Sequence, residues 1–594
     1  LKLVAAFDHR HILIDPDPDP ARSFAERQRL FALPGTTWDH YDRGALSAGA
    51  GIWPRTAKRI SLSHEVQELL GVQQNMISPN DLIKAILTAH VDLLWNGGIG
   101  TYVKGSTETH SDAADPVNDS VRVDAAQLHA SVIGEGGNLG LTQRARIEYA
   151  LGGGRINADF IDNAAGVATS DLEVNLKIAL DVAVHSGRIN HSERNALLSA
   201  SRPDVADAVL RNSESQTLAI SLAASQAPQL LNRHERLIDN LEHNNGISRA
   251  IEVLPTKKEL GSRTQAGLGL TRPEIAILLA QSKNVVQQDL LNSSVPDEPV
   301  FASALSAYFP PRIREQLSQE IRHHRLGREI VATKIADDLI NHIGPGLIYQ
   351  LDERLGVKTP DVTRAYAVVR AVFDIDEMWT DAEQHTDVTA VERWNRLHTL
   401  QHFIEHTTSW ILRRRPAPLD VEADIARYRP SVRELLASRP RPTTITETTE
   451  RLRFLAEVFD LIETAQHHGC PVETAAAIHT QSASELGLTW LTRRLDDHVT
   501  TNWWDAMAAA TVRDDLAERH HELVRAILDL ETGGKDQIRV WQDHTADAIS
   551  RFSRMIAELR RDGVVDVSRA CTASAELKLL VRSTGAGGAE DTAA

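Results

Sequence analysis

The sequence predicts an α/β plus all-α fold, in which part of a doubly wound sheet precedes a large helical region. Two observations favour this fold class. Between residues 130 and 166, two short apolar segments each run into a turn that contains glycine and asparagine. After Asp171 the strand patterns fade, and long stretches with 3.6-residue apolar spacing dominate. The change of pattern places the α/β part before the all-α part.

Short elements fill the first hundred residues. Apolar spacing predicts a strand that ends at Asp8, helices at residues 23–31, 63–70 and 80–87, and a strand at residues 91–95. A second extended piece follows the first strand and runs into an alternating Asp-Pro segment at residues 15–20. Because proline lacks an amide hydrogen and restricts the residue before it, this segment is neither a helix nor a central strand.

Two turns close the α/β part. Glu135-Gly136-Gly137-Asn138 follows a predicted strand at residues 130–133, and Asn163-Ala164-Ala165-Gly166 follows a predicted strand at residues 158–161, with a helix expected at 143–151 between them. Ligands of parallel sheets lie beyond the carboxyl ends of the strands, so both turns are expected to face one pocket. Glycine permits close approach of the backbone, and asparagine donates and accepts as a carboxamide or ribose requires. For each turn alone, a purely structural role is the alternative.

The rest of the chain divides into helical regions. We expect the α/β part at residues 1–190, helical regions at 191–438 and 445–582, and a disordered tail at 583–594, which is small and polar. Helices are predicted at residues 173–186, 215–224, 274–281, 312–323, 331–343, 360–373, 391–411, 448–467, 484–496 and 515–530. An Arg-Pro segment at residues 439–444 is expected to link the last two regions.

Composition limits the classes of function. A net charge of −17 over 594 residues argues against a general nucleic-acid binder, which needs a basic face. Two cysteines are too few for a disulfide framework and suit a reducing cytoplasm. No uninterrupted apolar run has the length of a membrane span. The chain opens on Leu1 within a predicted strand, and we therefore expect a fragment or cleaved product of a larger protein.

The order of these motifs resembles the cofactor-binding domain of glutamate dehydrogenases. In that family, Glu-Gly-Ala-Asn precedes Asn-Ala-Gly-Gly-Val-x-x-Ser, as residues 135–138 precede residues 163–170 here. The stretches at 7–11, 95–102, 143–150 and 153–157 are similar to the large bacterial NAD-specific enzymes. The resemblance implies a Rossmann-like domain, NAD as cofactor, L-glutamate and 2-oxoglutarate as substrate and product, and a homo-oligomer. Gly137 and Ala165 depart from the family pattern but remain small.

The resemblance also implies roles for particular residues. Asn138 is expected to approach the nicotinamide ribose, Asn163 to bond the nicotinamide carboxamide, and Ser170 to bond the side-chain carboxylate of glutamate. Asp8 would accept hydrogen bonds from the adenosine ribose if residues 1–7 form the second strand of a dinucleotide-binding domain. The alternative for Asp8 is a strand end without a ligand, and Ser170 also fits the N-cap of a helix that begins near Asp171.

The catalytic residues stay unassigned. The family's phosphate turn, substrate-binding lysines and catalytic aspartate are expected upstream of Leu1, and no lysine in residues 1–180 lies in a matching motif. We therefore expect little or no activity from the isolated chain. Two other functions remain open: a non-catalytic helical assembly or regulatory module with a relic cofactor domain, and the same chemistry on a branched-chain or aromatic amino acid.

One histidine pattern has a spacing that could bind a metal ion. His398, His402 and His406 recur every four residues on a predicted helix, with Glu405 beside them. A chain with 25 histidines produces such spacing readily, so a solvated helix face is the favoured interpretation and no metal site is predicted. The pairs at residues 467–468 and 520–521 are interpreted in the same way.

Overall fold

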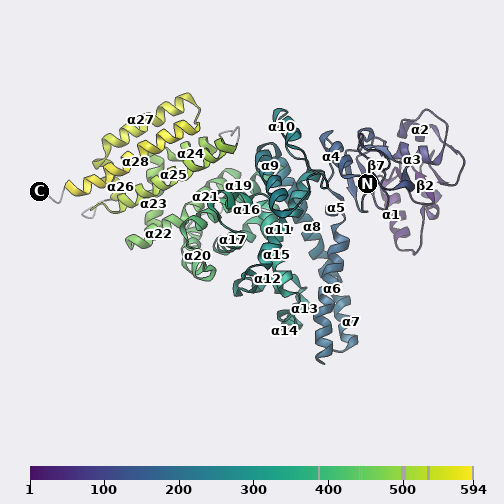
Figure 1. The fold of residues 1–594 in the computed structure, drawn as a ribbon, viewed down its shortest axis with the longest axis horizontal. Helices are drawn as coiled ribbons and strands as arrows, with labels where there is room; N and C mark the ends of the chain where they lie inside the picture. The colour runs from purple at the N-terminus through teal and green to yellow at the C-terminus, as the bar shows by residue number, and fades with distance from the viewer. Residues whose placement is uncertain (385–387, 440–441, 443, 497–502, 532–535, 591–594) are drawn as a thin grey trace. The chain divides into compact units, whose positions relative to one another are not determined.

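The structure is a computed structural model that describes residues 1–384, 388–439, 442, 444–496, 503–531 and 536–590 (Figure 1). It divides into two compact units. Unit 1 comprises residues 1–291 and 301–345, and unit 2 comprises the described residues of 292–300 and 346–594. Both units are largely helical, and the strands of the described residues all lie within the first 135 positions. No described helix combines the length and the apolar character that a membrane crossing requires.

The strands of unit 1 form four small sheets. Their bounds are β1 Ala5–Phe7, β2 His11–Ile14, β3 Gly51–Pro54, β4 Ile60–Ser61, β5 Met76–Ile77, β6 Leu93–Asn96, β7 Val103–Lys104, β8 Val123–Asp124 and β9 Val132–Glu135. β1, β2 and β3 form an antiparallel sheet, and β4 pairs antiparallel with β5. β6 pairs with β9, and β7 with β8, in parallel. The described strands thus include the expected parallel pairing but not one continuous doubly wound sheet.

The helices of unit 1 cover these strands and continue beyond them (Figure 1). Their bounds are α1 Pro20–Phe31, α2 His64–Leu70, α3 Pro79–Leu87, α4 Gln143–Leu151, α5 Asp159–Asp162, α6 Ala164–His185, α7 His191–Ala200, α8 Arg202–Ser225, α9 Ala227–Asn245, α10 Lys257–Gln265, α11 Arg272–Leu291, α12 Ala302–Tyr308, α13 Pro311–Gln316, α14 Ser318–Arg322 and α15 Gly327–Ile343. The hydroxyls of Ser63, Ser78 and Thr142 accept backbone N–H groups in the first turns of α2, α3 and α4. These caps explain where the three helices begin.

Buried apolar clusters among the described residues hold unit 1 together, and two of them join several elements each. The first joins the small sheets to α2, α3 and α4 and includes Ile12, Leu82 and Ile133. The second packs α6 against α13 and α14 through Leu180 and Ile313. The first cluster lies beneath β6 and β9, and it therefore gives the loops that follow these strands a fixed base.

The described residues of unit 2 form helices and the loops between them, without a strand. Their bounds are α16 Leu347–Leu355, α17 Thr359–Phe373, α18 Ile375–Gln384, α19 Ala390–Arg414, α20 Val421–Ala437, α21 Ile445–Ala456, α22 Val458–His468, α23 Val472–Leu486, α24 Leu488–Asp496, α25 Trp503–Leu528, α26 Gln537–His544, α27 Ala546–Asp562 and α28 Val567–Glu590. A buried cluster that includes Leu491, Leu523 and Trp541 joins the helices from α23 to α28.

Several predicted elements differ from the structure. Residues 158–161 are not a strand, because α5 occupies Asp159–Asp162, and the segment 163–166 is not a turn but the start of α6. A short apolar run does not separate strand from helix, and alanines after Asn163 favour helix. The helix predicted at 448–467 is divided at Glu457 into α21 and α22.

Two further predictions concern the ends of the helical regions, namely the tail and the linker. α28 reaches Glu590 and so extends into the segment predicted as a disordered tail, while residues 591–594 lie outside the described residues. The predicted linker at 439–444 contains residues 440, 441 and 443, which also lie outside the described residues.

Candidate functional site

The loops that follow β6 and β9 leave the same edge of a parallel strand pair. In the register of this pair, Asn96 lies opposite Glu135. The backbone N–H groups of Gly136 and Gly137 donate to the carbonyl oxygen of Asn96 at 2.9 and 3.0 Å. The loop after β9 is therefore bonded to the end of β6, at the edge where parallel sheets bind ligands.

The two asparagines singled out in the sequence meet at this edge. Nδ2 of Asn163 donates to Oδ1 of Asn138 at 2.6 Å and to the carbonyl oxygen of Gly137 at 3.1 Å. Asn138 is exposed and Asn163 is half-buried at the start of α6. The structure thus brings both residues together, although Asn163 arrives on a helix and not on a turn after a strand.

Close backbone contacts explain the glycines of this edge. A Cβ added to Gly137 would lie 2.9 Å from the carbonyl carbon of Gly98, and it would lie even closer to the carbonyl oxygen of Gly98. The ring of Trp95 lies against Gly134 and Gly136, where added Cβ atoms would meet it at 2.7 and 2.6 Å. Glycine is needed here because two backbones and one indole share the space, and no positive φ is involved at Gly137.

Buried carboxylates fix the loop that carries Asn138. Glu135 is completely buried and accepts from Nε and Nη2 of Arg146 at 2.7 and 3.0 Å. The backbone N–H of Leu141 donates to the same carboxylate at 3.1 Å, and that of Leu139 donates to Asp159 at 2.8 Å. Because these bonds lie on both sides of Gly140, the position of residues 136–141 is determined by charged groups that water does not reach.

A further carboxylate joins β9 to the end of α5. Asp162 accepts from the backbone N–H of Glu135 at 3.1 Å and from Nδ2 of Asn157 at 2.9 Å. Burial raises the pKa of Asp162, although these two donors act in the opposite direction. Neither Asp159 nor Asp162 was singled out in the sequence, because Asp159 was expected in a strand and Asp162 directly after it. Their spacing of three residues, which is typical of one helix face, was the available signal.

Ser170 lies on α6, on the C-terminal side of the asparagine pair. It is exposed and follows Asn163 by seven residues, which is two helical turns, so both residues lie on one face about 10 Å apart along the axis. The N-cap alternative for Ser170 is wrong, because α6 begins at Ala164.

Asp8 closes a hairpin in the structure. Its Oδ1 accepts the backbone N–H groups of Arg10 and His11, both at 2.7 Å, between the antiparallel strands β1 and β2. The role proposed for Asp8 assumed a parallel second strand, and the antiparallel pairing of β1 removes that assumption. Its contact with a ribose stays a prediction.

The histidine stripe is only partly a solvated face. His402 is exposed, but His398 is buried on α19, where burial lowers its pKa to about 4. His520 and His521 are also buried. The interpretation as a solvated face is therefore wrong for His398, His520 and His521, since sequence spacing does not show which face of a helix packs against its neighbours.

A pair of side-chain amides, one exposed and one half-buried, lies at the carboxyl edge of parallel strands, which is where α/β proteins bind small molecules. Comparison of the chain with known proteins identifies two family matches. Residues 1–223 match the family described as bacterial NAD-glutamate dehydrogenase, catalytic domain, and residues 267–441 and 436–578 match the family described as glutamate dehydrogenase, C-terminal.

Curated relatives agree with the family matches. NAD-specific glutamate dehydrogenases of Pseudomonas aeruginosa, Halomonas elongata and Mycobacterium tuberculosis are 38%, 36% and 35% identical to the chain, over 98%, 90% and 99% of its length. The chain spans 38%, 35% and 38% of the length of these relatives. The chain belongs to the bacterial NAD-specific glutamate dehydrogenase family.

Proposed function

We propose that this chain provides nicotinamide and substrate contacts for the NAD-dependent oxidative deamination of L-glutamate. In that reaction L-glutamate, NAD⁺ and water give 2-oxoglutarate, ammonium, NADH and a proton. Family membership supports the reaction class. The observation that carries the proposal for this chain is the direct contact between the side-chain amides of Asn138 and Asn163.

The asparagine pair suits a nicotinamide group chemically. Each side chain has a carbonyl acceptor and an NH₂ donor in one plane, and a primary carboxamide requires both. Asn138 is exposed, so a ligand can reach it, while Asn163 is held by Gly137 and the start of α6. NAD supplies the hydride acceptor when bound, and the contribution of these residues is to orient the ring.

Ser170 extends the proposed site toward the substrate. Its hydroxyl is exposed on the face of α6 that begins at Asn163. A hydroxyl in this position can donate to a carboxylate, as binding of the glutamate side chain requires. The groups that transfer protons are not assigned to residues of this chain.

The wider proposal follows from the same family. It includes a Rossmann-like arrangement around the parallel pair β6 and β9, a cytoplasmic location and a homo-oligomeric protein. The ribose contact of Asp8 also belongs to it, and it requires a further bond from a carboxylate that already accepts two backbone N–H groups.

Substitution of Asn163 by alanine tests the proposal in the native protein. Asn163→Ala removes the donor to Asn138 and one amide facing the proposed ligand, so we expect kcat/KM for NAD to fall about 10-fold, the scale of one or two lost hydrogen bonds. The assay is the initial rate of NADH formation at saturating glutamate. Asn195→Ala, at an exposed position on α7, is the matched control and should leave the rate unchanged. An unaltered rate in Asn163→Ala would favour the non-catalytic assembly module instead.

A further inference from the structure

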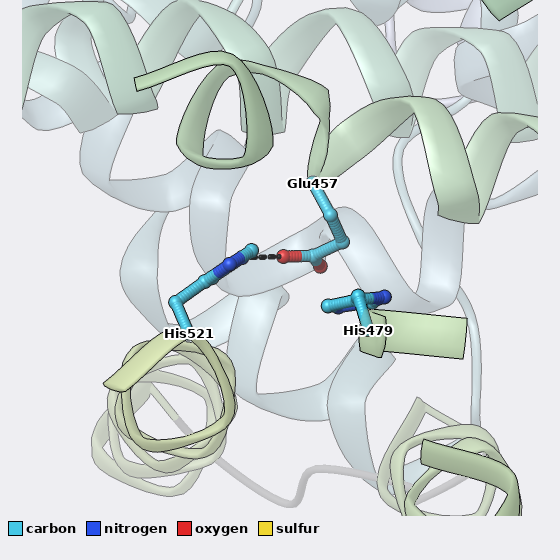
Figure 2. A group of neighbouring side chains, drawn as sticks. All are labelled: Glu457, His479 and His521. Atoms are coloured by element: carbon cyan, nitrogen blue, oxygen red, sulfur yellow. Dashed lines mark hydrogen bonds and ion pairs between the residues drawn. The ribbon is translucent and has the colours of Figure 1, made fainter. Parts of the chain in front are cut away.

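Three metal-ligating side chains meet inside unit 2, within the helical part of the chain. Glu457 lies at the junction of α21 and α22, His479 on α23 and His521 on α25 (Figure 2). Each offers one ligand atom, and these atoms lie within 4.8 Å of one another. Figure 2 shows the carboxylate of Glu457 between the two imidazoles. The three residues are well separated along the chain, so the packing of the helices brings them together.

The cluster is enclosed but has an open side. The side chain of His521 is 1% exposed, and its Nε2 lies 2.7 Å from Oε2 of Glu457. Its Nδ1 is buried and has no hydrogen-bond partner among the described residues. Glu457 and His479 are half-buried, which leaves a path for a small ion. One ion cannot bind both nitrogens of an imidazole, so Nε2, which lies beside Glu457, is the ligand atom of His521.

Neighbouring side chains hold the two imidazoles. The ring of His479 lies 4.1 Å from that of His520, and Nε2 of His520 lies 2.9 Å from the hydroxyl of Ser482. On the other side, Asp460 lies 3.7 Å from Nε2 of His521 and accepts from the indole N–H of Trp410 at 2.6 Å. The ring of His520 thus packs against that of His479, and Asp460 places a second carboxylate near the nitrogen of His521 that faces Glu457.

A metal ligand uses deprotonated atoms, so any proton on Nε2 of His521 must leave before an ion can bind. This nitrogen lies 2.7 Å from Oε2 of Glu457, and the two atoms would share that proton.

We propose that Glu457, His479 and His521 bind one divalent transition-metal ion of the Zn²⁺ class. Two nitrogens and one oxygen form a ligand set that Zn²⁺ accepts, with a fourth position left for water. Bond lengths of about 2.1 Å place tetrahedral ligand atoms about 3.4 Å apart, so side-chain rotations that close the present separation of up to 4.8 Å complete the site. The ion would displace any proton shared by His521 and Glu457 and would tie α21, α23 and α25 together.

Zinc titration of the whole chain tests this proposal. The chain is purified with a chelator, which is then removed, and Zn²⁺ binding is measured by calorimetry, with the visible absorption of Co²⁺ as a second readout. We expect one ion per chain. His479→Gln removes a half-buried ligand and should weaken binding at least about 10-fold, since even the partners of ligands contribute that much. His402→Gln changes an exposed histidine of the α19 stripe and should bind as the wild type does.

Three results would overturn the proposal: no one-to-one binding in the wild type, unchanged affinity in His479→Gln, or affinity lost in His402→Gln. The last result would place the ion on the histidine stripe of α19. Circular dichroism verifies that each variant is folded. Glu457→Gln, which keeps the shape of the side chain but removes its charge, provides a second variant and should lose the Co²⁺ spectrum even if His479→Gln does not fold.

Discussion

The contact between Gly137 and Gly98 allows a sharp test of the proposed site. In Gly137→Ala the new Cβ would lie 2.9 Å from the carbonyl carbon of Gly98, whereas ordinary contacts begin at 3.4 Å. The two loops must therefore separate by at least about 0.5 Å (3.4 − 2.9). The obstacle is backbone, so no side-chain rotation relieves it. Overpacking of this kind costs about 1–3 kcal/mol of the free energy of unfolding.

The same displacement should impair function more than stability. Gly137 is bonded to Asn163 and precedes Asn138, so movement of its loop misplaces the amide pair. Because displacements near 1 Å at a reacting centre cost up to about 100-fold, we expect kcat to fall at least about 10-fold in the native protein. Urea unfolding measures the first effect, and the rate of NADH formation measures the second.

Gly98→Ala is the matched control on the facing loop. A Cβ on Gly98 meets nothing within 4 Å, and its φ does not lie in the left-handed region. This variant should keep the wild-type rate and change the free energy of unfolding by less than about 1 kcal/mol. The reasoning is refuted if Gly137→Ala is as active and stable as Gly98→Ala, since the backbone contact would then be unimportant.

Two further predictions concern substrate choice and pH. Ser170→Ala should reduce kcat/KM for L-glutamate about 10-fold or more relative to kcat/KM for L-norvaline, because a hydrogen bond to a charged group is lost. L-norvaline lacks the side-chain carboxylate and serves as the reference substrate. An unchanged ratio of the two kcat/KM values would favour a different amino-acid substrate. His234 is 1% exposed on α9, and burial lowers its pKa from 6.5 to about 3. The unfolded chain therefore binds the proton more readily, so the stability that neutral His234 confers is complete above pH 6.5 and decreases toward pH 3. When the pH is lowered from 7 to 5, the free energy of unfolding measured in urea should fall by about 2 kcal/mol more in the wild type than in His234→Leu. Equal decreases in the two proteins would contradict the lowered pKa of His234.

The sequence predicted the parts of the site that depend on local signals and chain order. The helix at 143–151 is confirmed as α4, because the hydroxyl of Thr142 marks its start and Gly152 its end. The meeting of Asn138 and Asn163 was also predicted, since both were expected at the carboxyl ends of parallel strands. Only β9 fulfils that expectation, while Asn163 reaches the same edge from the start of α6.

Tertiary contacts decided what the sequence did not reveal. Asp159 and Asp162 belong to a helix whose carboxylates hold the Asn138 loop, and no local pattern specifies those partners. Burial of His521 depends on α22, α23 and α25 packing together, so its neighbours in the chain do not indicate it. A pattern of residues along one helix shows its faces but not which face is covered.

Trp95 places an optical reporter beside the asparagine pair. Its ring lies against Gly134 and Gly136, next to the loop of Asn138, and the residue is 58% exposed. Indole emission responds to solvent and overlaps the absorption of reduced nicotinamides. The fluorescence difference between the wild type and Trp95→Phe therefore isolates one of ten tryptophans. If NADH binds as proposed, quenching of this signal would follow occupancy of the edge directly, in real time and without a label.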